Sequence, residues 1–252
     1  MLIAGIGVVW TVLLFLDLSI RGEVLQFNNA TWGYGISAGI SVAIANILLL
    51  ESLRHMEVSL GSTIYRLNTI AVVLLSILLL GESITLIKLA GIGCGIVAVL
   101  FLYQQQHSDG LHATLKTGLI IVVVGALLRA VYGILTKAGL LNGANTDSLM
   151  LISAICWIVS GLIYAIGIEK QYSLTREKLV YSVVSGLLVY GIVRTLVMAL
   201  TFGEASIVIT IANMSFLMAL LVAVILKMEA LSWRKVIAMF FAVSAIVLLS
   251  LA

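Results

Sequence analysis

Polar breaks divide the chain into apolar segments that recur along its whole length. About 20 apolar residues in a helix cross a hydrocarbon core roughly 30 Å thick, and most of the segments reach that length. They are continuously apolar rather than alternating, and lipid offers no partner for backbone N–H and C=O groups, so helices are predicted rather than a barrel. The predicted helices lie at about 2–20, 31–53, 59–80, 85–103, 116–138, 148–168, 179–201, 205–227 and 233–251. The predicted fold class is therefore all-α: a polytopic transmembrane bundle of about nine helices.

The composition supports the membrane assignment. Hydrophobic residues make up 62% of the chain and charged residues 10%, and the mean hydropathy is +1.23. A soluble domain carries about 25% charged residues. The net charge of +3 is small and spread among loops, so a nucleic-acid partner is not expected. We expect a multi-pass protein of the cell membrane, in bacteria the inner membrane, with the lipid bilayer as its surroundings.

An internal repeat is visible at an offset of 147 residues, the difference between Glu229 and Glu82. At this offset Trp10 aligns with Trp157, and the motif beginning at Gly81-Glu82 aligns with the one beginning at Met228-Glu229. Further aligned pairs are Gly39 with Gly186, Glu57 with Glu204, Ser59 with Ser206, Thr63 with Thr210 and Arg66 with Asn213. The repeat predicts two homologous halves.

The two halves differ by one helix. Residues 1–104 would form a first repeat of four helices and residues 113–252 a second of five, so the helix at 116–138 has no counterpart in the first. A four-helix and a five-helix unit joined in this way place corresponding loops on opposite faces of the membrane. Inverted repeats of this kind are a common plan of secondary transporters, although any duplicated hydrophobic bundle would show a similar pattern.

Each half contains a helix, a short loop, a second helix, an acidic residue and a final helix. In the first half the sequence reads ESLRHMEVSLGSTIYRLNTIAVVLLSILLLGESITLIKLAGIGCGIVAVLFLY, and its echo is MALTFGEASIVITIANMSFLMALLVAVILKMEALSWRKVIAMFFAVSAIVLL. This pattern resembles the drug/metabolite transporter superfamily, in particular its EamA-like permeases. The resemblance covers nearly the whole chain. It implies a secondary transporter with no enzymatic activity.

Members of that family usually have ten helices, five in each half. This chain departs from the pattern because the first helix of the first half is missing. Two explanations are open. Either Met1 is not the natural start, or the protein is a nine-helix variant whose first repeat is completed by a second copy or by a helix of a partner.

Three arginines lie inside predicted helices: Arg66, Arg129 and Arg194. A charge at mid-membrane costs at least about 2.5 to 3.5 kcal/mol, so such residues usually face a bundle interior or a wet cavity. A guanidinium group binds a carboxylate or phosphate through two parallel hydrogen bonds, which indicates an anionic or zwitterionic solute. The alternative is a structural ion pair, for example between Glu51 and Arg194.

Other polar and aromatic side chains lie on the same helices, several at helical spacing from an arginine. Trp10 and Trp157 could stack on a solute, or they could be packing residues. Glu82 and Glu229 open their final helices, where capping is the expected role. The resemblance implies a cavity lined by five of these helices. The expected substrate-binding residues are Arg66, Arg129, Arg194, Glu51, Asn46, Asn68, Tyr132, Tyr190, Asn213, Trp10 and Trp157.

Signatures of enzymes and cofactor sites are missing from the sequence. There is no HExxH motif, no GxxxxGK[ST] loop for ATP and no paired intramembrane aspartate. The two cysteines stand alone in separate helices, and all three histidines lie in loops. We expect neither a cofactor nor a metal ion.

The predicted function is secondary transport of a small polar metabolite by alternating access. Glu51 would serve as a counter-ion or as a proton-coupling group. Two alternatives remain: a flippase for a lipid-linked anionic headgroup, and a membrane subunit that only scaffolds a partner. Of the Lys and Arg residues outside helices, eight share one face and three, Arg21, Lys88 and Lys137, share the other, which predicts that the first face is cytoplasmic.

Overall fold

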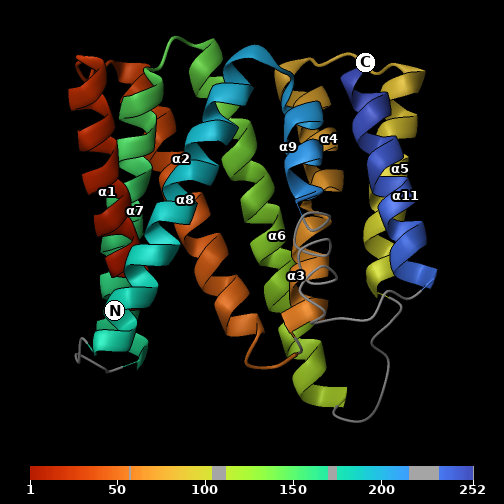
Figure 1. Ribbon diagram of the computed structural model, residues 1–252, viewed down its shortest axis with the longest axis horizontal. Helices are drawn as coiled ribbons and strands as arrows, with labels where there is room; N and C mark the ends of the chain where they lie inside the picture. The colour runs from red at the N-terminus through yellow and green to blue at the C-terminus, as the bar shows by residue number, and fades with distance from the viewer. Residues whose placement is uncertain (57, 104–111, 170–174, 216–232, 252) are drawn as a thin grey trace. The chain divides into compact units, whose positions relative to one another are not determined.

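The computed structural model describes residues 1–56, 58–103, 112–169, 175–215 and 233–251. All regular elements in these ranges are helices, which confirms the all-α prediction (Figure 1). The helices are α1 Leu2–Arg21, α2 Asn29–Ser52, α3 Val58–Arg66, α4 Asn68–Leu80, α5 Leu86–Tyr103, α6 His112–Leu141, α7 Thr146–Tyr164 followed by the π-helical turn η2 Ala165–Glu169, α8 Arg176–Phe202, α9 Ala205–Asn213 and α11 Trp233–Ser250.

Five of the described helices are long and apolar enough to cross a membrane. These segments are Leu2–Arg21, Asn29–Ser52, Lys116–Leu141, Thr146–Gly167 and Arg176–Phe202. Shorter apolar helices cover Ile64–Leu80, Leu86–Phe101 and Val236–Ser250. Many large apolar side chains remain exposed along them, as expected for helices whose outer faces meet hydrocarbon. The predicted class of multi-pass membrane protein is therefore supported by helix length and composition.

The chain forms two compact units that do not follow the order of the predicted repeats. Unit 1 contains Met1–Ile47 and Val131–Phe202, and unit 2 contains Leu48–Ala130 and Gly203–Ala252. Each unit thus combines helices from the first half of the sequence with helices from the second half. The unit boundaries fall inside α2 and inside α6.

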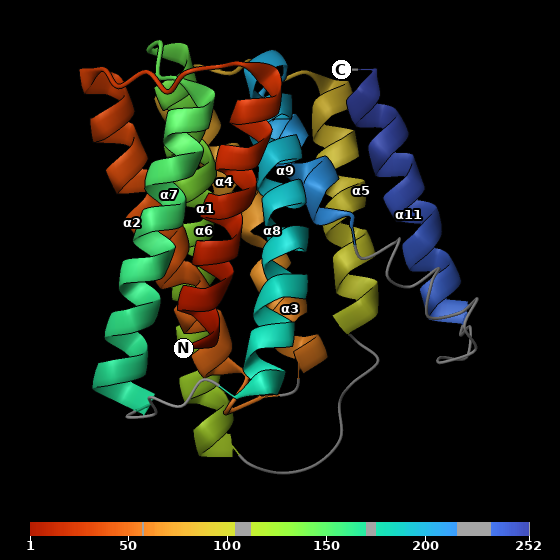
Figure 2. The same cartoon turned by 60° about the vertical axis from the view of Figure 1, so that its left-hand side comes forward.

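In unit 1, α1 packs against both α7 and α8. Figures 1 and 2 show α1 and α7 running in opposite directions, as an inverted repeat requires. Close approach depends on glycines at equivalent positions. A Cβ atom at Gly39 would lie 2.8 Å from the sulfur of Cys156, and one at Gly186 would lie 2.6 Å from Cβ of Val9. Both pairs are related by the offset of 147 residues, so the same packing contact occurs twice in the unit.

In unit 2, α5 and α11 form the most extensive helix pair, and α4 packs against α9. Ala98, Val99, Met214 and Ala242 form a buried apolar cluster between these helices. The ring of Phe101 stacks on that of Phe241, with centroids 6.1 Å apart. Small residues on α5 and α11 allow the two helices to approach closely, which is how membrane helices gain packing energy without a hydrophobic driving force.

The single helix expected at 59–80 is divided into two helices. α3 ends at Arg66 and α4 begins at Asn68, with Leu67 between them. The helix expected at 205–227 likewise ends at Asn213, and residues 216–232 lie outside those described. Hydropathy predicted the apolar span correctly, but it carries no information about a local break of the backbone ladder.

Candidate functional site

The two repeat-related tryptophans meet inside unit 1. The rings of Trp10 on α1 and Trp157 on α7 lie edge to face, with centroids 5.9 Å apart. Trp10 is 1% exposed and Trp157 is 8% exposed. Because the two residues are equivalent in the repeat, their contact lies where the inverted helices α1 and α7 cross. Aromatic pairs of this geometry contribute about 0.5 to 1.5 kcal/mol beyond their buried area.

A group of four charged residues joins three helices of unit 1. Arg194 Nη1 on α8 lies 2.5 Å from Oδ1 of Asp147 at the start of α7, and Arg194 Nε lies 3.7 Å from Oδ2 of Asp17 on α1. Arg21 Nη2 binds the same two acids, at 3.1 Å from Asp147 and 3.0 Å from Asp17. Arg21 also binds the more exposed Glu23 at 2.5 Å, which adds a third acid at the edge of this group. Arg194 is therefore ion-paired, although with Asp147 and Asp17 rather than with Glu51, whose described ion pair is with Arg54 at 3.4 Å.

Several buried hydrogen-bond donors have no partner among the described residues. In unit 1 these are Trp10 Nε1, Trp157 Nε1 and the Tyr190 hydroxyl, and in unit 2 the Tyr65 hydroxyl. The Tyr190 hydroxyl lies close enough to the Asp17 carboxylate for the two groups to interact. Native structures leave few buried polar groups unpaired, and each one needs an explanation such as a water, an ion or a ligand.

Two further residues expected at the site also lie in unit 1. Tyr132 on α6 is 2% exposed and borders a narrow void without room for a water molecule, which Thr136 and Ser153 also line. The side-chain amide of Asn46 donates to the carbonyl oxygen of Val42 in its own helix, at 2.7 Å. In this conformation, both side chains are held by the protein itself.

The remaining expected residues belong to unit 2, and three of them meet where the helices break. Arg66 Nη1 donates to the carbonyl oxygen of Asn213 at 2.8 Å and to Ser215 Oγ at 3.0 Å. The amide of Asn213 donates to Asn68 Oδ1 at 2.6 Å and to Thr69 Oγ1 at 2.7 Å. Arg66 and Asn213 are repeat mates, so this polar crossing joins equivalent points of the two halves.

Glu51 and Arg129 also lie in unit 2. Glu51 is near the end of α2, where it pairs with Arg54. Arg129 on α6 is close enough to Tyr65 for its charge to act on the phenol. The structure thus separates the expected site residues into two groups, with Glu51, Arg66, Asn68, Arg129 and Asn213 in unit 2 and the other six in unit 1.

Glu82 caps a different helix from the one expected. Its carboxylate accepts hydrogen bonds from the backbone N–H of Ala205 (2.6 Å), from that of Ser206 (3.2 Å) and from the Ser206 hydroxyl. These groups form the N-terminus of α9, whereas Thr85 caps the following helix α5 through the N–H of Lys88. Gly81, with φ 66°, ends α4 in the left-handed region and lets the chain turn there. Glu229 lies outside the described residues.

Lys88 and Glu204 complete this acidic cap. Lys88 is 3% exposed, and its ammonium group binds Glu204, Glu82 and the carbonyl oxygen of Ser83. Burial alone would raise the pKa of Glu82. The hydrogen bonds from Ser206 and Ala205, together with the Lys88 charge, outweigh burial and hold that pKa below its ordinary value.

The three cations predicted for the less positive face are all held inside their units. Arg21 is ion-paired, Lys88 is buried against two acids, and Lys137 is 9% exposed with its ammonium group 2.8 Å from the carbonyl oxygen of Leu200. On the opposite face Arg54 is likewise ion-paired, with Glu51, so these contacts do not distinguish the faces and the orientation stays a prediction.

Sequence reasoning missed Asp147, Ser215 and Lys88. Asp147 follows the N-cap residue Asn145 and reads as an ordinary acidic residue in a first helical turn, and Lys88 reads as a loop cation. The excess of intramembrane arginine over acid was the available signal. It could have prompted a search for acids at the ends of neighbouring helices.

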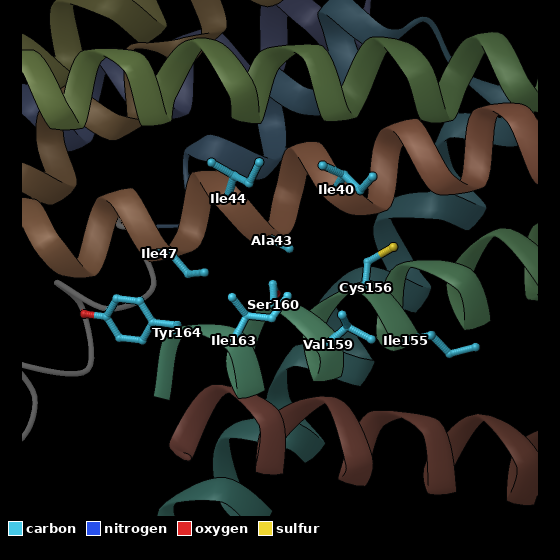
Figure 3. A pocket seen from close by; sticks show the side chains of 10 residues that line it. All are labelled: Ile40, Ala43, Ile44, Ile47, Ile155, Cys156, Val159, Ser160, Ile163 and Tyr164. Atoms are coloured by element: carbon cyan, nitrogen blue, oxygen red, sulfur yellow. The ribbon is translucent and has the colours of Figure 1, made fainter. Parts of the chain in front are cut away.

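An apolar cavity of about 550 Å³ lies between α2 and α7 in unit 1. Figure 3 shows the lining side chains, which come from α2 on one side and α7 on the other. Ile44, Val159 and Ile163 are 41%, 50% and 66% exposed, so the cavity opens at the surface of the helices. The hydroxyl of Ser160 is already bonded to the carbonyl oxygen of Trp157. The cavity therefore suits hydrocarbon rather than a polar solute.

Neither a metal centre nor a cofactor cradle is evident in the parts of the chain that the structure covers. No group of three or more His, Cys, Asp or Glu residues there could hold a metal ion.

Residues 1–104 match the model of the EamA-like transporter family. The match confirms the resemblance to the drug/metabolite transporter superfamily that the sequence pattern predicted. That family suggests a membrane transporter rather than an enzyme.

The fold occurs in a solved crystal structure. That structure superposes with a TM-score of 0.80 at 16% sequence identity, and the match covers 99% of this chain and 88% of the other. At this identity the likeness concerns the fold alone. No curated protein matches the chain.

Proposed function

We propose that this protein is a secondary transporter that moves a small polar, anionic or zwitterionic metabolite across the membrane by alternating access. The observation that carries the proposal is the set of buried donors in unit 1. Trp10 and Trp157, both expected at the site from sequence, hold indole N–H groups without partners among the described residues. Oxygen atoms of a solute are the partners that such donors would bind.

The energetic argument is that these donors are costly in the empty protein. Each buried donor without a partner costs about 1 to 3 kcal/mol, so a solute that satisfies several of them gains affinity. Apolar replacements would pack equally well, which argues against a purely structural role for the indole N–H groups. Alternating access would open this region in turn to each side of the membrane.

Arg194 would enter the cycle as an exchangeable ligand. Its guanidinium group is held by Asp147 and Asp17 in this conformation. A solute carboxylate could replace one of these acids on Arg194 without leaving an unpaired charge in the membrane. This arrangement favours a zwitterion, whose amine could meet the carboxylate that the arginine releases.

The test is uptake by proteoliposomes from a panel of radiolabelled amino acids and small carboxylates. We expect saturable uptake of at least one compound, reduced about tenfold in kcat/KM by each of W10F, W157F and R194Q because each removes a hydrogen bond to the solute. R129Q probes the partly buried arginine of α6 in the same way. Variant W233F, which alters an exposed tryptophan, serves as the matched control.

Two outcomes would contradict the proposal: no saturable uptake above protein-free liposomes for any compound, or unchanged uptake in all the site variants. R66Q also removes the bonds to Asn213 and Ser215, so lost uptake in that variant would not by itself locate the solute.

A second candidate, a flippase for a lipid-linked anionic headgroup, is favoured by the apolar cavity between α2 and α7. A cavity of about 550 Å³ without free polar groups on its described walls suits part of an acyl or isoprenoid chain. Ala43 lies on its wall, and A43W would fill it. If the flippase function holds, A43W lowers translocation of a fluorescent polyprenyl phosphate. If the metabolite function holds, A43W leaves uptake of soluble compounds unchanged.

A further inference from the structure

The broken helices of unit 2 stop at matching positions of the repeat. α3 ends at Arg66, and α9 ends at Asn213, 147 residues later. Next to these ends the buried residues Asn68 and Thr69 begin α4, at 3% and 4% exposure. Two helix ends are therefore placed side by side within a segment that hydropathy reads as continuous membrane span.

A helix that ends inside a membrane leaves carbonyl oxygens without partners and presents the negative end of its dipole. Lipid cannot supply a donor, so these groups must be satisfied internally. In transporters with discontinuous helices, such ends commonly coordinate a sodium ion or a proton that couples transport. The C-terminal end of α9 likewise presents carbonyl oxygens that need a positively charged or hydrogen-bond-donating partner.

Here the positive group comes from the protein. Arg66 Nη1 lies 2.8 Å from the carbonyl oxygen of Asn213, the last residue of α9, and 3.0 Å from Ser215 Oγ in the turn that follows. The side chain of Asn213 holds the crossing in register by donating to Asn68 and Thr69 at the start of α4. The guanidinium thus faces oxygen atoms of one helix end, while the amide of Asn213 ties that end to the other half.

We propose that Arg66 is a tethered cation that neutralises the end of α9, at the kind of position where a coupling ion binds in other discontinuous helices. Arg66 is accordingly a positioning residue that acts through α9. Removing its head group leaves a cation site built from the Asn213 carbonyl and the Ser215 hydroxyl. A planar cation with several N–H donors would fit that vacancy better than a spherical metal ion.

The experiment uses the purified full-length protein in detergent and measures its Tm. We expect R66A to unfold several degrees below the wild type. Millimolar guanidinium chloride should restore most of the lost Tm in R66A while leaving the wild type unchanged. Sodium chloride at equal ionic strength should restore little. R66K, which keeps the positive charge, should fall between the two and provides a folded variant if R66A does not accumulate.

Two controls distinguish the effect of the Arg66 charge from loss of any arginine and from loss of the neighbouring hydrogen bonds. R54A removes an arginine from the loop after α2, and its Tm should not respond to guanidinium. N213A keeps the backbone carbonyl but loses the amide bonds to Asn68 and Thr69, so it should lose stability without rescue by guanidinium.

An R66A protein as stable as the wild type would overturn the proposal. So would equal recovery with sodium and guanidinium, which would reduce the effect to ionic strength, or rescue of R54A to the same extent. The measurement needs no solute. A negative result here therefore leaves the transport proposal intact, and absence of uptake would leave this role of Arg66 intact.

Discussion

The two units place repeat-related residues in contact, but they do so with different chemistry. In unit 1 the mates Trp10 and Trp157 meet as an aromatic pair whose N–H groups have no partners among the described residues. In unit 2 the mates Arg66 and Asn213 meet through hydrogen bonds that satisfy a helix end. In unit 1 the indole N–H groups of the pair are available to bind a solute. In unit 2 the polar groups of the pair are used to hold two helices together.

This difference suggests that the pair in unit 2 stabilises a helix crossing and that the pair in unit 1 is available to bind a solute. Polar groups that are already satisfied stabilise a helix crossing but offer little to a solute. Donors without partners do the reverse, because they cost stability until something binds them. The substitutions below would sharpen or break this comparison, in order of decreasing effect on stability.

Asp147 should be the most sensitive position in unit 1. Its side chain is 7% exposed and binds both Arg21 and Arg194. D147N would leave Arg194 with Asp17 alone, and Arg21 with Asp17 and the exposed Glu23. Breaking a buried pair in this way costs about 3 to 5 kcal/mol. The measurement is the Tm of the detergent-solubilised protein. E23Q, at an acid that is 54% exposed, is the control and should change Tm little. Equal losses in both variants would show that burial of the group does not matter.

Gly161 tests the packing of α7 against α1. A Cβ atom at this position would lie 2.5 Å from the backbone nitrogen of Ala4, and backbone cannot move as a side chain can. G161A should therefore cost up to about 3 kcal/mol through overpacking. The control is G191A on α8, where a Cβ atom meets nothing within 4 Å and a gain in helix propensity is expected. A stable G161A would mean that α1 and α7 can separate freely.

Glu82 provides a pH-dependent test of unit 2. E82Q weakens the cap on α9 and should cost about 1 kcal/mol at neutral pH. The pKa of Glu82 in the folded protein lies below its ordinary value of 4.5, so its contribution is complete above that value and disappears as the pH falls through the folded pKa. The difference in Tm between wild type and E82Q should therefore shrink in acid. A difference that grows in acid would reverse the assigned sign.

The tryptophans should show the smallest effect on stability. W10F and W157F remove a buried N–H that has no partner among the described residues, so the Tm should stay nearly constant or rise slightly. Uptake should fall in the same variants. Loss of stability of more than about 2 kcal/mol would instead mark the indoles as packing residues, as for other large core truncations.

Local sequence was enough to predict the membrane class, the positions of most described helices and the register of the repeat. These properties depend on the length and polarity of local segments, which the bilayer reads directly. The pairs Trp10 with Trp157 and Arg66 with Asn213 could be aligned from sequence alone, and the structure brings both pairs into contact.

Which polar groups bind one another depends on how the helices pack. In the folded chain the span at 59–80 consists of two helices. Arg194 forms ion pairs with Asp147 and Asp17, and the Glu82 carboxylate accepts a hydrogen bond from the N-terminus of α9. A hydropathy scale assigns each charged side chain its own cost of entering the membrane and does not include its partners. These partners lie on other helices, as far as 177 residues away for Asp17 and Arg194, and are fixed by which helix ends come together when the bundle packs.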